Sequence, residues 1–189
     1  MNATFETLAP QRRSAGEPPI RTIEVASGVG SGPTRLAAFD AALQSAGVGN
    51  FNLITLSSVI PPGTAVTSID EALSNADAEW GDRLYVVMAE MRVDQSGQQA
   101  WAGVGWTQER ESAKGLFVEH EGHSEAEVRH DLEATLTSIA GSRDEVFGPL
   151  EYAVQGTVCR DEPACALVVA VYGSAPWPPP VSEPVISLS

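Results

Sequence analysis

The stretch GVGNFNLITLSSVIPPG, residues 47–63, carries the strongest structural signal in the sequence. Residues Asn52 to Ser57 form a run rich in β-formers, which predicts a short strand. The Pro-Pro-Gly run at 61–63 cannot continue a sheet ladder, so the strand is expected to end before it. The Ser57-Ser58 pair therefore lies where the chain leaves a strand and enters a stiff turn.

The pattern on both sides of this stretch predicts more strands than helices. Strands are expected over residues 21–26, 83–91, 100–106, 115–121, 152–159 and 164–172. One helix is expected over 34–45, and a capping box at Ser124 and Glu127 opens a second that runs to about Ala140. A turn at 95–97 favours an antiparallel hairpin, and 68–76 favours a short helical turn. The predicted class is α+β, a layered αββα-type sandwich with largely antiparallel sheets.

Length and charge limit the organisation and the function. The 189 residues fit one domain, expected over 21–173, with a flexible arm at 1–20 and a proline-rich tail at 174–189. There are 25 acidic and 11 basic residues, a formal net charge of −14, which disfavours nucleic acid as a partner. No signal peptide or membrane-length apolar run is visible, so a cytoplasmic protein without a membrane partner is expected.

Three further patterns are weighed and set aside. The glycines at 28–32 lie between a strand and a helix but lack the full spacing of a dinucleotide-binding loop. The histidines at 120, 123 and 130 match no zinc signature, and no metal is expected. Cys159 and Cys165 could lie close across a hairpin, yet a reducing cytosol favours free thiols.

Three segments in order resemble the pyruvoyl-dependent arginine decarboxylase family. In the first, Gly49-Asn50 and a short strand lead to Ser57-Ser58, two apolar residues and Pro-Pro. The segment PTRLAAFDAAL at 33–43 is similar to the family's first helix, and GLFVEHEG at 115–122 to its glutamate-bearing strand. The resemblance covers about residues 22–172 and is weaker over 64–112. It implies a chain that cuts itself between Ser57 and Ser58.

The chemistry of that junction explains why a serine is needed. The Ser58 hydroxyl can attack the Ser57 carbonyl to form an ester, and elimination and hydrolysis then leave a covalent pyruvoyl group, with no metal and no pyridoxal phosphate. This group would form a Schiff base with the amine of an amino acid and promote loss of CO₂. The alternative is that the Ser-Ser pair merely ends a strand.

The resemblance also implies roles for individual residues. Glu119 would deliver the proton to the substrate carbon, although a strand places Glu121 on the same face and spacing alone leaves both open. Asn52 would orient groups around the pyruvoyl carbonyl, or else only close a turn. The predicted catalytic residues are thus Ser58, Glu119 and Asn52.

Substrate binding is assigned by resemblance to the first helix and the loop after it. Asp40 would pair the guanidinium of L-arginine, which would be converted to agmatine and CO₂, and Leu36, Gly49 and Phe51 would line the same pocket. The family resemblance further implies a homo-oligomer, a trimer of cleaved protomers.

Two other functions remain open at this point. An N-terminal-nucleophile hydrolase also cleaves itself, and Ser58 would then keep its free amine as a base. A non-enzymatic paralogue would never mature and would serve as a binding subunit.

Overall fold

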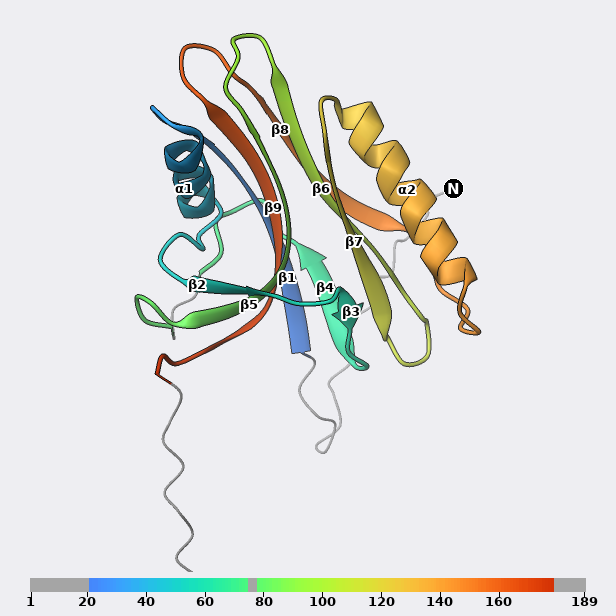
Figure 1. The fold of residues 1–189 in the computed structure, drawn as a ribbon. Helices are drawn as coiled ribbons and strands as arrows, with labels where there is room; N and C mark the ends of the chain where they lie inside the picture. The colour runs from blue at the N-terminus through green and yellow to red at the C-terminus, as the bar shows by residue number, and fades with distance from the viewer. Residues whose placement is uncertain (1–20, 75–77, 179–189) are drawn as a thin grey trace, which may run out of the picture.

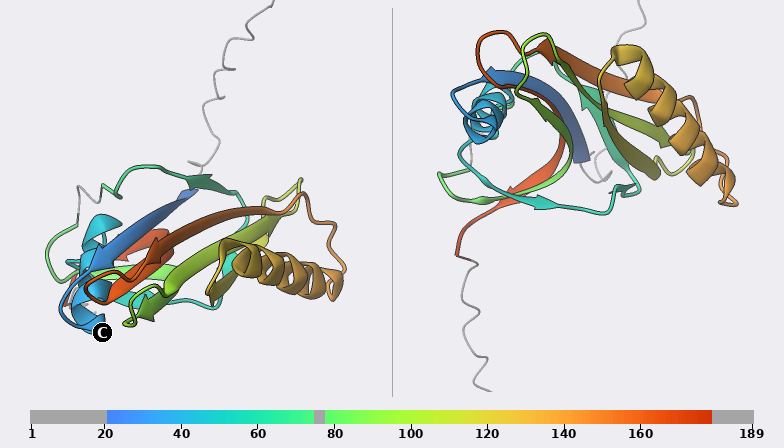
Figure 2. Two further views of the ribbon diagram at one scale, coloured as in Figure 1. Left: turned by 90° about the horizontal axis from the view of Figure 1, so that it is seen from above. Right: turned by 45° about the horizontal axis from the view of Figure 1, so that its top comes forward.

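The computed structural model describes residues 21–74 and 78–178, and two β-sheets face each other at its centre (Figure 1). The first sheet has the strand order β2-β5-β9-β1-β4, formed by Asn52–Thr55, Arg83–Val93, Ala164–Ala175, Arg21–Ser31 and Thr64–Ser68 respectively. The second has the order β3-β7-β6-β8, formed by Val59–Ile60, Gly115–Gly122, Gln99–Gln108 and Glu151–Val158. Helix α1 (Arg35–Ser45) covers the outer face of the first sheet and α2 (Glu125–Gly141) that of the second (Figure 2). The predicted αββα sandwich is confirmed.

Most strand pairs are antiparallel, and two at the margins of the first sheet are parallel. Strand β1 pairs in parallel with β4, and β2 pairs in parallel with β5. Both parallel pairs lie at edges, where each outer strand has a single neighbour. The sheets are therefore largely antiparallel, as predicted.

Strand β9 shows how the core is divided into layers. It is buried without interruption from Ala164 to Val171 because both of its faces are covered. Its even-numbered residues join the cluster between the two sheets, and its odd-numbered residues join the cluster beneath α1. A third cluster fills the space between α2 and the second sheet.

The glycines of β1 allow α1 to approach closely. A Cβ atom on Gly28 would lie 2.2 Å from the Ala42 carbonyl oxygen, and one on Gly30 would lie 2.3 Å from that of Ala38. Residues 27–31 were expected to be a loop, but they continue β1 to Ser31. Helix packing against the bare backbone overrides the low strand propensity of glycine here.

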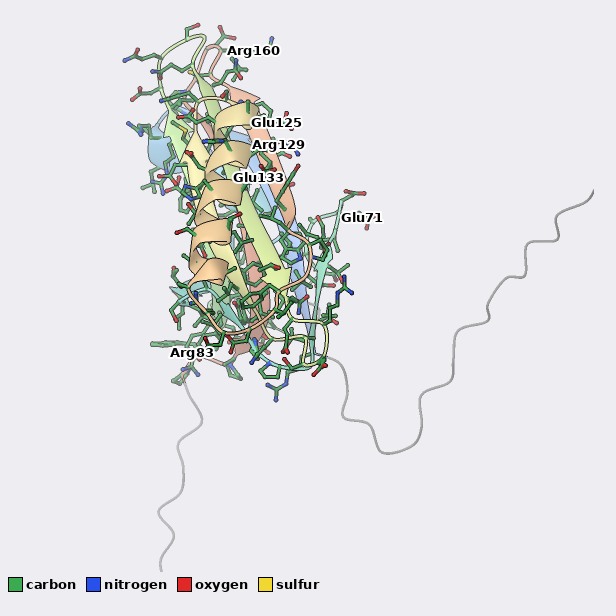
Figure 3. The ribbon with its side chains drawn as sticks, turned by 90° about the vertical axis from the view of Figure 1, so that its right-hand side faces the viewer. Glu71, Arg83, Glu125, Arg129, Glu133 and Arg160 are labelled. Atoms are coloured by element: carbon green, nitrogen blue, oxygen red, sulfur yellow. The ribbon has the colours of Figure 1, made fainter. Side chains whose placement is uncertain are left out.

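Helix α2 begins at the predicted cap. The Ser124 hydroxyl accepts a hydrogen bond from the Glu127 backbone N–H at 3.2 Å. In its first turns Glu125 forms an ion pair with Arg129, whose guanidinium lies over the Tyr152 ring of β8, while exposed Glu133 projects away from the sheet (Figure 3). Inward-facing Val128, Leu132 and Leu136 are fully buried, so the helix is amphipathic as its spacing predicts.

The predicted hairpin over 83–91 and 100–106 is wrong. The turn at Gln95–Gly97 forms, with Gly97 at φ +86°, but β5 and β6 enter different sheets and face each other across the core. Strands β8 and β9 are likewise consecutive in the chain but belong to different sheets, β8 to the second and β9 to the first. Cys159 and Cys165 are accordingly free and lie in different core clusters rather than across a hairpin.

Residues near β4 also depart from expectation. The chain forms strand β4 at Thr64–Ser68, and no helical turn follows over 68–74, while 75–76 lie outside the described residues. The predicted arm at 1–20 lies outside them as well. Of the tail predicted at 174–189, Ser174 and Ala175 instead belong to β9, and residues 179–189 lie outside the described residues. Within the described ranges, neither helix combines the length and the apolar character needed to cross a membrane.

Candidate active site

Ser58 lies in the short connection between β2 and β3 and has an unusual backbone conformation. Its φ angle is +64°, in the left-handed region that costs a residue with a side chain roughly 1–2 kcal/mol. Strand β3 then pairs antiparallel with β7, and the Phe117 N–H donates a 2.8 Å hydrogen bond to the Ser58 carbonyl. Because the β3–β7 pairing begins directly after Ser58, its hydrogen bonds help keep the Ser58 backbone in the left-handed conformation.

The Ser58 hydroxyl donates a short hydrogen bond to the carboxylate of Glu119. Both side chains are partly buried, whereas Glu121 is exposed further along β7. Sequence spacing left both glutamates open, and the structure brings Glu119 to Ser58. The role of Glu119 in proton transfer stays a prediction.

Two aromatic residues, Phe117 and Tyr172, lie beside Ser58 and Glu119 and were not among the predicted site residues. These four residues together are called the Ser58 corner below. The Tyr172 hydroxyl donates to the Val59 carbonyl at 3.0 Å, and its ring meets that of Phe117 edge-on, with centroids 6.0 Å apart. Burial, with a smaller effect from Glu119, raises the pKa of Tyr172 above its usual range. The only sequence signal was the Tyr-Gly pair at the end of an apolar strand, which reveals no partner on another sheet.

Asn52 does not join this corner. Its amide donates a 2.5 Å hydrogen bond to the Gly81 carbonyl, and its backbone N–H donates to the Asp82 carbonyl at 2.8 Å. The side chain therefore holds the turn that precedes β5. A role at the pyruvoyl carbonyl stays a prediction.

The predicted substrate-binding residues gather on and beside α1. Asp40 and Leu36 are exposed and share the rim of a shallow hollow of about 530 Å³. The Gln44 amide donates a 2.7 Å hydrogen bond to the Asp40 carboxylate. Gly49 packs against the same glutamine, since a Cβ atom on Gly49 would lie only 2.6 Å from the Gln44 Cγ atom. Phe51 instead packs on the core cluster beneath the helix.

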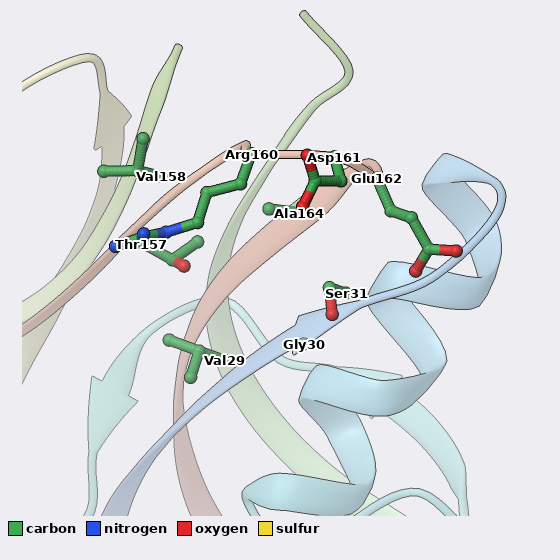
Figure 4. A pocket seen from close by; sticks show the side chains of 9 residues that line it. All are labelled: Val29, Gly30, Ser31, Thr157, Val158, Arg160, Asp161, Glu162 and Ala164. Carbon is green, nitrogen blue, oxygen red and sulfur yellow. The ribbon is translucent and has the colours of Figure 1, made fainter. Parts of the chain in front are cut away.

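Ser58 is not among the residues that line the hollow on α1. A hollow of about 360 Å³ lies beside β3 and is lined by residues 59–62, Lys114, Leu116, Glu145 and Phe147 among others. A larger cavity of about 610 Å³ lies by the β8–β9 connection, between Arg160 and Ser31, and contains none of the predicted residues (Figure 4).

Two of the three histidines form hydrogen bonds with neighbouring elements. His120 shares a 2.7 Å hydrogen bond with the Thr135 hydroxyl, and His123 one of 3.1 Å with the Gln99 carbonyl. Across residues 21–74 and 78–178, no group of three or more metal-binding side chains comes together.

The Ser58 corner fits a cofactor made from the chain itself. A hydroxyl lies next to its own strained peptide unit and donates a hydrogen bond to a carboxylate. These features suit the class of pyruvoyl-dependent enzymes, in which a serine supplies the prosthetic group.

Comparison with known proteins gives the family. The profile of the family described as pyruvoyl-dependent arginine decarboxylase matches residues 22–176, and the chain belongs to this family. A pyruvoyl-dependent arginine decarboxylase of Halobacterium salinarum is 39% identical over 157 residues, which cover 81% of this chain and 94% of the relative. One from Thermococcus kodakarensis is 29% identical and covers 78% and 91%.

Among solved structures, the chain is similar to a pyruvoyl-dependent histidine decarboxylase. The match has a TM-score of 0.41 and 16% identity, and it covers 75% of this chain and 62% of that one. A similarity of this extent does not bear on the function.

Proposed function

We propose that the chain cuts itself between Ser57 and Ser58 and then decarboxylates L-arginine to agmatine with the pyruvoyl group made from Ser58. The observation that carries this proposal is the left-handed Ser58 whose hydroxyl is bonded to Glu119. Family membership and the names of the relatives support the reaction and its substrate.

Self-cleavage follows from the chemistry of the junction. The Ser58 oxygen bonds to the Ser57 carbonyl carbon, the carbon–nitrogen bond breaks, and the hydroxyl proton ends on the released nitrogen. Glu119 orients the hydroxyl by accepting its hydrogen bond. Loss of the Ser58 α-proton then expels the Ser57 carboxylate, and water releases ammonia to leave a ketone at the start of 58–189.

A pyruvoyl group at this position would supply an electrophilic ketone, which can take up the substrate amine and the electron pair left by loss of CO₂. Glu119 stands beside the atom from which this group is made, so a protonated Glu119 can return a proton to the substrate carbon. The Phe117 N–H bonds the Ser58 carbonyl, which becomes the amide conjugated with the ketone, and this donor stabilises negative charge there.

Substrate selection rests on the α1 surface. A desolvated guanidinium needs a carboxylate partner, and exposed Asp40 offers one beside the apolar Leu36. Leu36 is 68% exposed beside Asp40, so this surface is open to a substrate or to a second protomer. The proposal includes a homotrimer of cleaved protomers, in which a neighbour would complete this surface. It also includes a location in the cytoplasm.

Two measurements on the purified protein test this function. Mass spectrometry should find a 58–189 fragment lighter than its serine-ended form by one ammonia, and CO₂ release from an amino-acid panel should be fastest with arginine. A serine-ended fragment would favour the N-terminal-nucleophile hydrolase, and an uncut chain would favour the non-maturing paralogue. Release of CO₂ from another amino acid alone would overturn the substrate but leave the pyruvoyl chemistry.

A further inference from the structure

Tyr172 occupies an irregular position near the end of β9. Strand β9 pairs with β5 residue for residue as far as Val171 and Val86, and the next pair joins Gly173 to Tyr85. Tyr172 is therefore the extra residue of a β-bulge, and it has no partner on β5. Bulges bend a strand and aim side chains, and they recur beside active sites.

The side chain of Tyr172 reaches the segment that follows the proposed cut. Its hydroxyl donates to the Val59 carbonyl at 3.0 Å. One residue earlier, the Ser58 carbonyl accepts the Phe117 N–H at 2.8 Å. The two peptide units after Ser58 are thus each held by a donor, the first from the second sheet and the next from the first sheet.

We propose that Tyr172 is a positioning residue for self-cleavage, which clamps Val59 so that Ser58 keeps its left-handed conformation. This inference rests on the proposed function. The φ angle is a rotation about the Ser58 N–Cα bond, so a change from +64° can swing the Ser58 carbonyl and the residues after it, and the Tyr172 bond to Val59 opposes that movement. The edge-on contact with Phe117 fixes the ring, so the hydroxyl is aimed rather than free to swing.

The phenol also keeps its proton under ordinary conditions. Burial and the neighbouring Glu119 both raise the pKa of Tyr172, so the hydroxyl remains a donor throughout the neutral range. A clamp of this kind holds Val59 independently of the protonation of Glu119.

The test is the time course of cleavage in freshly synthesised full-length chain. Tyr172→Phe removes the hydroxyl and keeps the ring, and cleavage should slow on the order of tenfold, the effect of one lost hydrogen bond. The matched control is Tyr152→Phe, whose hydroxyl instead bonds Arg129 on the outer side of the second sheet, and it should cleave at the wild-type rate. Equal rates for Tyr172→Phe and the wild type would overturn the inference.

Hydroxylamine separates positioning from a later step because it splits the ester that self-cleavage forms. Since Tyr172 is proposed to act before the ester exists, hydroxylamine should not restore the rate of Tyr172→Phe. Restoration to the wild-type rate would place the hydroxyl in the elimination step and overturn the proposal.

A stability measurement excludes a general folding defect. Tyr172→Phe is compared with Tyr152→Phe in an uncleavable Ser58→Ala background, and the two thermal midpoints should agree within a few degrees. A large fall in the thermal midpoint of Tyr172→Phe alone would mean that cleavage is slow because the fold is destabilised, and it would overturn the inference. If the wild type itself stays uncut, the proposed function fails, and that result is distinct from each of these.

Discussion

The Ser58 corner and the outer face of α1 differ in how complete they are within one chain. At the corner, Ser58, Glu119, Phe117 and Tyr172 are joined by contacts from both sheets. On α1, Asp40 is exposed and is bonded only to Gln44 among the described hydrogen-bond partners. The helix lies at the far side of the first sheet from β3 (Figure 1). Making the cofactor should therefore need one chain, whereas binding the substrate should need a neighbour.

Ser58→Ala is expected to have the largest effect, because it removes the nucleophile of the corner. The variant should stay a single chain of 19.9 kDa on a denaturing gel, while the wild type gives fragments 1–57 and 58–189. Wild-type protein mixed with the variant should not cut it, since the corner is complete within each chain. Two bands from Ser58→Ala would contradict cleavage by Ser58.

Glu119→Gln is expected to divide the functions of the corner. A glutamine oxygen still accepts the Ser58 hydrogen bond, so the chain should fold and cleave. It has no acidic proton to deliver, so decarboxylation should fall on the order of 100-fold or more. Glu121→Gln, an exposed change on the same strand, is the control and should keep near-normal turnover. Near-normal turnover of Glu119→Gln would move the proton donor elsewhere.

Asp40→Asn should affect the second region alone. Loss of a charge-assisted contact of roughly 1.5–3 kcal/mol should raise the KM for arginine about ten- to a hundredfold, with cleavage unchanged. The control is Asp94→Asn, another exposed acid, whose partner is Arg35 at 3.8 Å. If both variants keep the wild-type KM, Asp40 does not bind the guanidinium.

The smallest effect concerns the inner side of α1. Burial, with a smaller contribution from Glu90, raises the pKa of Cys165 beneath the helix to about 12. Because the folded thiol holds its proton more tightly than the unfolded one, whose pKa is 9.0, the free energy of unfolding should fall as the pH rises above about 9. Denaturant titrations should show this slope in the wild type and a shallower one in Cys165→Ala. Equal slopes would mean that the helix covers the thiol less tightly than its burial indicates.

The periodicity of the sequence predicted the helices, most of the strands and their layers, whereas only the family resemblance selected Glu119 over Glu121, because spacing along a strand places both on one face. It could not predict that the turn at Gln95–Gly97 joins two sheets, since a turn forms equally well when its flanking strands pair or face each other. Tyr172 was missed for a related reason: its partner, Val59, is distant in sequence and lies across the sandwich. The extension of β1 through Gly28 and Gly30 depends on a helix that only the folded chain supplies.

The order of strands in the first sheet has a consequence for a chain cut after Ser57. Strand β1, from the first piece, lies between β9 and β4, and β2 pairs with β5, so three ladders join the pieces. Unfolding would then separate two molecules, and its equilibrium would depend on protein concentration. Refolding would require the pieces to meet and interleave, a second-order step that the uncut chain never faces. Self-cleavage would thus turn a chain that can refold by itself into a pair whose native state is reached most readily before the cut.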